Sequence, residues 1–207
     1  MKQLTISIIL MAIFGTISLG QVGVDPIAQK FTYKTVVTGP SIGIEGLYKA
    51  SLNWFSLHYF PENAIVEEKD SAHHYFRSLC NFRDTFKFNE PHASYEPNVY
   101  YALLTTDVYY TLEMQVKEGK CIITISGLHF KYYIPGSSMA NHSDTGRTIE
   151  NTFENQYRDI VIKADASVDQ KKSWQAFFKS CDRRLNALIR SYKKYISTSA
   201  SDNGNAF

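Results

Sequence analysis

The sequence predicts an α+β domain: a five-stranded antiparallel sheet with two helices packed on one face, in the order β-α-β-β-β-β-α. Three observations predict this class. A β-hairpin is evident at 109–133, amphipathic helical spacing occurs before and after a group of strands, and Tyr (14) and Phe (13) are plentiful. Aromatic and β-branched residues favour strands, and two amphipathic helices can cover one face of such a sheet while its other face stays in water.

The hairpin at 109–133 is the clearest of these features. Glu118-Gly119 would form its two-residue turn, in which Gly supplies the positive φ that the turn requires. Side chains alternate along a strand, so pairing outward from this turn places three apolar pairs on one face. These pairs are Val116 with Cys121, Met114 with Ile123, and Leu112 with Ile125. The opposite face is mostly polar, which is typical of an antiparallel sheet covered on one face only.

The first 20 residues have the pattern of a secretory signal peptide. A short charged start precedes an apolar run from Leu4 to Leu19, and Ser18-Leu19-Gly20 provides a small-x-small ending. An uncleaved membrane anchor is the alternative, although the run is shorter than the roughly 20 residues that a span needs. Cleavage near Gly20 predicts export to the periplasm or the medium. It would remove Lys2, lowering the formal charge from +2 to +1, and leave 21–29 as a loose leader.

The first two elements of the domain are a strand and a helix. Residues 30–38 are β-branched and aromatic and predict the strand. Ser41 is the expected N-cap of a helix that ends near Tyr59. Helical spacing predicts that its inward face consists of Leu47, Ala50, Trp54 and Leu57.

Two strands are expected between this helix and the hairpin. The first spans 64–69, and a turn at 70–72 leads into the second, at 73–88. In the second strand even positions are mostly apolar and odd positions mostly polar, which predicts burial of one face. Residues 89–106 contain two prolines and show no clear period, so we expect an irregular excursion there.

The end of the chain predicts a long connection and a long helix. Residues 134–168 are expected to form a loop, with a short helix around 149–157. A helix then runs from Asp169 to about Thr198, and the tail at 199–207 is expected to be disordered. The apolar stripe of this helix consists of Trp174, Phe177, Phe178, Cys181, Leu185, Leu188, Ile189, Tyr192 and Ile196. Residues 30–198 would therefore form one domain.

All three cysteines fall on predicted apolar faces. Cys80 and Cys121 belong to strands and Cys181 to the last helix. We expect buried free thiols, which is a normal role for cysteine. A single disulfide that leaves one free thiol is the alternative, because export permits disulfide formation.

The chain also resembles a known family. The telling residues are Leu47-Tyr48 followed by Trp54-Phe55, and Tyr110-x-Leu112 leading to the segment 116–120. On these residues the chain resembles, over about 30–133, the family catalogued as domain of unknown function 4468. The resemblance implies a TBP-like fold and an exported protein of Bacteroidota. It supplies no catalytic residues, and the chain departs from the family where Cys121-Ile122 replaces the more common Tyr-Arg.

The residues that could carry chemistry do not form a recognised motif. Five of them crowd one predicted hairpin: Glu67, Glu68, Asp70, His73 and His74. Adjacent His side chains in a strand point to opposite faces, so a solvated turn is favoured over a metal site. Three residues of the long loop are the only candidates for a hydrolase, and no nucleophile elbow accompanies them. They are His142, Asp144 and Arg147. We therefore expect no cofactor, no metal and no catalytic residue.

The last helix is basic on its outer side. The residues concerned are Lys171, Lys172, Lys179, Arg183, Arg184, Arg190, Lys193 and Lys194, opposed only by Asp169 and Asp182. A solvated helix face explains this pattern. The alternative is an anionic partner such as a lipid headgroup or an acidic protein. Nucleic acid is not expected, because the open sheet face has no basic stripe and export removes the protein from the genome.

These observations favour an exported, non-catalytic module that binds a protein or a cell-envelope component. The candidate surface comprises Tyr75, Arg77, Tyr109, Thr111, Glu113 and Gln115, with Arg183 and Arg184. The alternative is a carrier of a small apolar ligand held between the sheet and the last helix. In that case Trp174, Phe177 and Phe178 would meet Met114 and Ile123. A hydrolase is the third candidate.

Overall fold

A computed structural model defines the fold. It describes residues 22–24, 31–39, 43–59, 62–89, 101–134, 138–139, 142–143, 146–162 and 167–204. The predicted signal peptide and most of the predicted leader lie outside these residues, so both stay predictions. Part of the leader, Val22–Val24, is a short strand.

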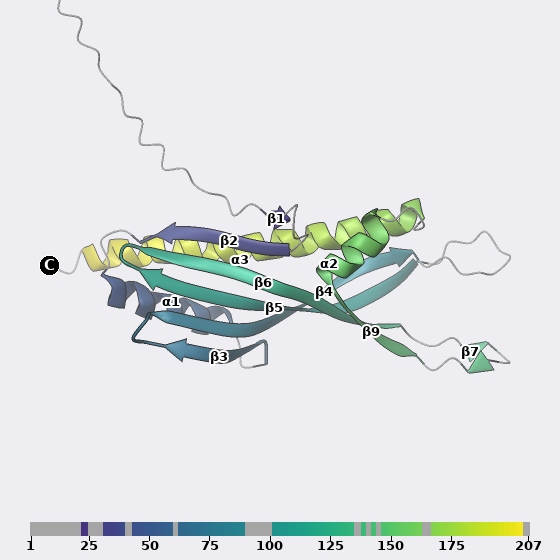
Figure 1. Cartoon of the computed structure of the whole chain (residues 1–207), viewed down its shortest axis with the longest axis horizontal. Helices are drawn as coiled ribbons and strands as arrows, with labels where there is room; N and C mark the ends of the chain where they lie inside the picture. Colours follow the sequence, from purple (N-terminus) through teal and green to yellow (C-terminus); the bar gives the residue numbers. More distant parts are fainter. Residues whose placement is uncertain are drawn as a thin grey trace, which may run out of the picture.

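One antiparallel sheet forms the centre of the molecule (Figure 1). Its strand order is β1-β2-β6-β5-β4-β3, and β9 pairs with β6 beside this path. The strands are β1 (Val22–Val24), β2 (Phe31–Thr38), β3 (Ala64–Asp70), β4 (Tyr75–Asn89), β5 (Tyr101–Lys117), β6 (Lys120–Ile134) and β9 (Arg147–Thr152). The α+β class and the five predicted strands are confirmed, and β1 and β9 are additions. A separate two-stranded ladder pairs β7 (Ser138–Met139) with β8 (His142–Ser143).

The predicted hairpin is confirmed in its turn and in its register near the turn. Val116 pairs with Cys121, Met114 with Ile123 and Leu112 with Ile125. Gly119 has a φ of 68°, a conformation that glycine adopts without the steric cost a Cβ would add. All six paired side chains are buried. The alternation of apolar residues therefore selected the correct inward face.

Two helices cover that inward face (Figure 1). They are α1 (Ile44–His58) and α3 (Val168–Gly204), and we call the side of the sheet beneath them the covered face. The Ser51 and Tyr192 hydroxyl oxygens lie 2.7 Å apart in the core, and Trp54 Nε1 donates to Ser191 Oγ at 3.3 Å. These contacts join the two helices.

The start and the inward face of α1 differ from the prediction. Gly43 is the N-cap and makes no side-chain capping bond, so the prediction of Ser41 as the cap is wrong. The side chain of Leu57 is 68% exposed, whereas Trp54 is buried. At 100° per residue Leu57 lies about 120° from the centre of the buried face, which is formed by Leu47, Tyr48, Ser51, Trp54 and Phe55.

Two predicted irregular regions contain regular structure. Residues 101–106 are not an excursion, because they form the start of β5 and pair with β4. The connection at 134–168 contains β9, the short helix α2 (Phe153–Gln156) and a π-helical segment η1 (Tyr157–Ile162). The short helix expected around 149–157 thus begins only at Phe153, where the Thr152 side chain accepts a hydrogen bond from the Asn155 N–H. At the other end, α3 continues to Gly204, so disorder is wrongly predicted for 199–204.

The first half of α3 packs into a cluster of aromatic rings. Trp174 lies 5.3 Å from both Phe86 and Phe130 between ring centroids, and 6.1 Å from Tyr132. Phe31 of β2 stacks on Phe178 at 5.6 Å. Rings from β2, β4, β6 and α3 therefore fill the space beneath this part of the helix. None of the helices that the structure describes is both long enough and apolar enough to cross a membrane.

The three cysteines are free and buried, as predicted, and the single-disulfide alternative is wrong. Burial raises the pKa of Cys80 to about 12 and the pKa of Cys121 to about 11. The pKa of Cys181 is also raised, first by burial and then by the charge of Asp84. Because the thiolate is the reactive form, all three thiols are chemically protected in the folded protein.

We therefore expect the folded protein to resist thiol reagents. At pH 8 a disulfide reagent such as Ellman's reagent should leave Cys80, Cys121 and Cys181 unmodified, whereas all three should react promptly in denaturant. Absorbance of the released thiolate measures both rates. Rapid modification of any of the three thiols in the native state would contradict the structure.

Candidate functional site on the open face of the sheet

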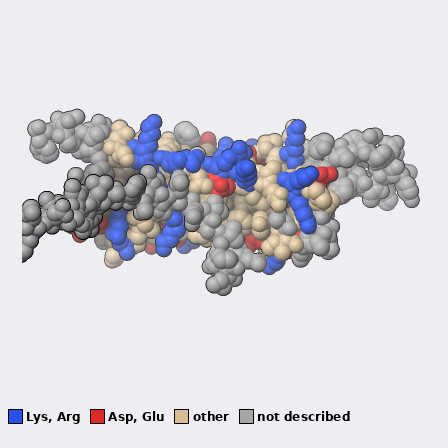
Figure 2. Space-filling view, turned by 90° about the horizontal axis from the view of Figure 1, so that it is seen from above, with Lys and Arg blue, Asp and Glu red and all other residues tan. Residues whose placement is uncertain are grey.

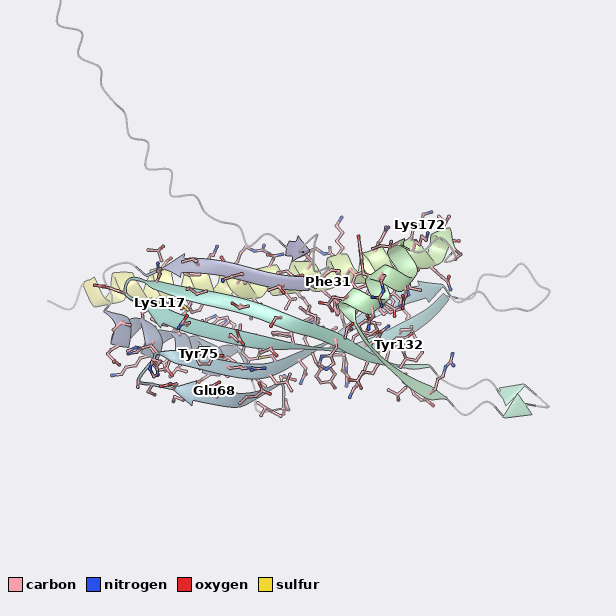
Figure 3. The ribbon with its side chains drawn as sticks, in the orientation of Figure 1. Phe31, Glu68, Tyr75, Lys117, Tyr132 and Lys172 are labelled. Carbon is pink, nitrogen blue, oxygen red and sulfur yellow. The ribbon has the colours of Figure 1, made fainter. Side chains whose placement is uncertain are left out.

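Among the described residues, no helix packs on the other side of β4, β5 and β6, and we call this side the open face. Six predicted surface residues lie together on it. Tyr75 and Arg77 come from β4, and Tyr109, Thr111, Glu113 and Gln115 come from β5. Tyr75 is registered opposite Gln115, and Arg77 opposite Glu113. Figure 3 shows Tyr75 beside Glu68 of the edge strand β3.

The other two predicted residues belong to a different surface. Arg183 and Arg184 are exposed on α3, on the covered side of the sheet. The Arg184 guanidinium donates to the main-chain carbonyl of Arg83, and its Cζ lies 5.0 Å from the centroid of the Phe82 ring. Arg184 thus attaches α3 to the outer edge of β4, and neither arginine joins the open face.

The charged side chains of the open face pair across the strands. Arg77 Nε lies 3.1 Å from Glu67 and 3.8 Å from Glu113, and Arg83 Nε lies 2.7 Å from Asp107. Burial, followed by the charges of Glu113 and Glu68, raises the pKa of Tyr75, so this phenol stays protonated at neutral pH. Exposed ion pairs of this kind contribute only about 0–1 kcal/mol each to stability. Their main effect is to hold the side chains in fixed positions.

A second cluster on this face surrounds Tyr109. The His129 ring stacks on Tyr109, with 5.1 Å between centroids and 12° between planes. Lys131 Nζ lies 5.6 Å from the Tyr109 centroid and 3.0 Å from Glu150 of β9. His129 Nε2 is 3.9 Å from the same carboxylate. Tyr109 is therefore held between a cation and an imidazole on the surface.

A β-bulge aligns the Tyr109 cluster. Tyr109 pairs with His129, but Thr111 pairs with Ser126, so β6 contains one extra residue between these positions. Gly127 lies within the bulge and has a φ of 63°. Continuing the register of the turn without this bulge would place Leu128 opposite Tyr109. With the bulge, Leu128 is fully buried and His129 reaches the open face beside an open cleft of about 480 Å³.

The bulge predicts the effect of a single substitution. Gly127→Ala should lower the free energy of unfolding by about 1–2 kcal/mol, because a Cβ is disfavoured at positive φ. Space is not the cause, since the nearest atom to an added Cβ would be Thr111 Oγ1 at 3.6 Å. Urea unfolding followed by circular dichroism measures the change.

Gly43→Ala is the matched control for this substitution. Gly43 has a φ of −58°, and an added Cβ would meet nothing within 4 Å. Gly43→Ala should change the free energy of unfolding by no more than about 0.5–1 kcal/mol, as expected for replacing Gly at a helix N-cap. Equal effects of the two substitutions would contradict the bulge.

The residues considered for a metal site do not converge. Asp70 accepts bonds from the main-chain N–H groups of Ala72 and His73, and its carboxylate lies 2.5 Å from His73 Nδ1. His74 Nε2 lies 2.7 Å from Glu45 of α1, while Glu67 pairs with Arg77. Within the described ranges, no three His, Cys, Asp or Glu side chains are arranged to hold a metal ion.

The loop residues considered for a hydrolase are only partly placed. Asp144 lies outside the described residues. His142 belongs to β8, and Arg147 begins β9, where it is registered opposite Ile134. Among the described residues of this connection, no nucleophile, base and acid lie in contact with one another.

The proposed apolar ligand site between sheet and helix is occupied by side chains. Phe177 lies 4.6 Å from Phe86 and 5.6 Å from Phe130 between ring centroids. The rings that Trp174 and Phe178 contact also come from β2, β4, β6 and α2. The three aromatic residues of α3 therefore pack against other rings and belong to the same buried core as Met114 and Ile123.

Comparison with known proteins finds a family model that matches part of the chain. Residues 33–131, from β2 to β6, match the family model described as a domain of unknown function (DUF4468) with TBP-like fold. The predicted resemblance to the DUF4468 family is confirmed. The family description assigns no activity to the DUF4468 region, and no curated protein matches the chain.

The solved structures that are similar to the chain include two from Bacteroides and Parabacteroides. A DUF4468 family protein from Bacteroides ovatus shares 12% identity, with 79% of this chain and 86% of that chain covered and a TM-score of 0.49. A TBP-like protein from Parabacteroides distasonis shares 11% identity, with 79% and 93% covered and a TM-score of 0.47.

The sequence alone did not identify His129, Lys131 and Glu150 as part of the surface around Tyr109. Gly127 was the available signal, because a glycine inside a strand pattern often marks a bulge. Glu150 had no such signal. Its position depends on β9 pairing with β6, which places Lys131 opposite Glu150.

Proposed function

We propose that this protein is an exported, non-catalytic module that binds a partner protein through the open face of its sheet. One observation carries the proposal. The open face presents Tyr75, Arg77 and Tyr109 from neighbouring strands, and no described helix covers them. Arg77 is held by its ion pair with Glu67, and Tyr109 by the ring of His129. Tyr and Arg are enriched among the residues that dominate binding energy at protein interfaces.

The fixed positions of these side chains favour binding. A side chain that is already immobilised loses little conformational entropy when a partner binds, whereas a free one costs about 0.5–1.5 kcal/mol. Tyr109 is held by the ring of His129, and Lys131 is held by Glu150. The surface is therefore preorganised around Tyr109.

The chemistry of the open face favours a protein over a polyanion or a small ligand. Arg77, Arg83 and Lys131 all have carboxylate partners on the same face. Both charge signs are thus interspersed, and such a surface complements a mixed polar surface better than a ligand of one charge. β5 spans 17 residues, and at about 3.3 Å per residue the face is long enough for an extended interface.

Paired variants test this proposal. Arg77→Ser combined with Tyr109→Ser removes two anchors from the open face. Lys49→Ser combined with Leu57→Ser removes one cation and one large side chain from the exposed outer side of α1. Each tagged protein is isolated from its native cells, and co-isolated proteins are quantified by mass spectrometry.

The Arg77 and Tyr109 double variant should recover at least about tenfold less of the partner protein than the wild type, because hot-spot truncations cost about 1–2 kcal/mol or more each. The Lys49 and Leu57 double variant should recover as much of it as the wild type. Circular dichroism establishes that both variants are folded. Equal recovery of the same proteins with both variants would exclude the open face as the binding surface.

Export is the part of the proposal that rests on the first 20 residues. The mature protein should begin at Gln21 and be recovered outside the cytoplasm, because the apolar run ends at a small-x-small sequence. Intact-mass measurement of the protein from fractionated cells tests this. A mass that includes residues 1–20 would contradict cleavage and favour the anchor.

A further inference from the structure

We propose that α3 carries a second binding surface, a cationic ridge that docks onto an anionic lipid bilayer. The ridge consists of Lys172, Lys179, Arg183, Arg190 and Lys194, and all five are exposed. It lies on a different side of the protein from the proposed partner surface. The ridge and the proposed partner surface can therefore be tested independently of each other.

The spacing of these residues places them in a row. Successive members are separated by seven, four, seven and four residues, so at 100° per residue they fall within about 60° of one another around the helix. The buried side chains of α3, among them Trp174, Leu185 and Tyr192, lie on the opposite side of the helix. At about 1.5 Å per residue the ridge extends roughly 33 Å.

The charges of the ridge are available to a partner. In the described part of the chain, Lys179, Arg183, Arg190 and Lys194 have no carboxylate within ion-pair distance, and Lys172 has only Asp169 at 3.9 Å. The arginines of the open face, by contrast, are paired. Figure 2, seen from the side where α3 and β2 lie along the top of Figure 1, shows Lys and Arg clearly outnumbering Asp and Glu.

The shape of the ridge favours a flat surface. Its exposed neighbours include Ala176 and Ala187, which are small enough to let the cations approach a plane. The row contains no aromatic or large apolar anchor of the kind that dominates protein interfaces. A bilayer of anionic headgroups offers charges along the whole ridge, and each Lys or Arg near such a surface adds to binding.

Vesicle sedimentation with the full chain tests the inference. Binding is measured to vesicles of 30% phosphatidylglycerol in phosphatidylcholine and to vesicles of phosphatidylcholine alone. The quantity of interest is the difference between the two, because apolar insertion by residues 1–20 would contribute to both. This difference should be clear at low salt and vanish by about 0.5 M NaCl, where charges are screened within a few ångströms.

Two triple variants with the same change in net charge separate the ridge from total charge. Lys179→Ala, Arg183→Ala and Arg190→Ala remove the centre of the ridge. Lys49→Ala, Lys69→Ala and Lys87→Ala remove three exposed cations elsewhere. The ridge variant should lose about a hundredfold in lipid affinity, or roughly fivefold per cation, and the control should stay close to the wild type.

Three results would overturn the inference. The first is no preference of the wild type for anionic vesicles at low salt, and the second is an equal loss in both triple variants. The third is tighter binding of the ridge to soluble polyglutamate than to the vesicles, which would assign the ridge to an acidic protein instead. Circular dichroism of both variants checks that the fold is retained.

Discussion

Trp174→Ala should lower the free energy of unfolding by about 3–5 kcal/mol, the usual loss when a large aromatic side chain is removed from a core. The side chain of Trp174 is 1% exposed. Five rings surround it with centroid separations of 5.3–6.1 Å, namely Phe86, Phe130, Tyr132, Phe177 and Phe178. These rings come from three different elements and cannot all move inward to fill the space.

Such a loss is a large fraction of the roughly 5–15 kcal/mol that stabilises a typical domain. Urea unfolding at 25 °C measures it, and the thermal midpoint should fall by about 10 °C or more. Leu57→Ala is the matched control. Its side chain is 68% exposed, so the effect should stay within about 0.5 kcal/mol. A Trp174 variant within about 1 kcal/mol of the wild type would contradict the aromatic core.

Raising the pH above about 10 should unfold the protein. Burial is the first cause that raises the pKa of Tyr33, Tyr59, Tyr110 and Tyr192 above the ordinary value of about 10. These phenols are neutral when protonated, so their contribution to stability is fully present below pH 10. It is lost as the pH rises toward the folded pKa, because the unfolded chain ionises first.

The loss is roughly 1.4 kcal/mol per group for each pH unit above 10, which gives about 6 kcal/mol for the four tyrosines by pH 11. The buried thiols add to it from about pH 9, because their unfolded pKa is lower. Urea unfolding at pH 8 and pH 10.5 should show this decline. Absorbance at 295 nm should show a delayed group of tyrosines that ionise together with unfolding. A single smooth titration near pH 10 in a folded protein would contradict the prediction.

The sequence predicted the fold most accurately where two independent patterns agreed. In the hairpin, Gly119 marked the turn and the apolar alternation marked the face, and both are confirmed. The prediction was wrong where the local pattern was broken. Leu103 and Leu104 break the alternation at the start of β5, and only Leu104 is buried, so the strand showed no period.

The remaining elements depend on partners that are distant in the sequence. β9 contains mostly polar residues, and it is a strand because β6 continues beyond β2 and offers β9 a free edge. The residues of the candidate site also fall into two groups, those predicted from a local pattern and those that depend on distant strand pairing. Tyr75, Arg77, Tyr109, Thr111, Glu113 and Gln115 were placed correctly from strand alternation. The neighbours of Tyr109 require the bulge at Gly127 and the pairing of β9, which no local pattern specifies.

Site-specific photo-crosslinking in the native cells tests the central proposal most directly. A benzoylphenylalanine is introduced at Tyr109, on the open face, and in a separate strain at Leu57, on the exposed side of α1. The proposal predicts a discrete crosslinked protein from position 109 and none of the same mass from position 57. The Arg77→Ser substitution should weaken that crosslink. The same crosslinks from both positions, or none from position 109, would contradict the open face as the binding surface.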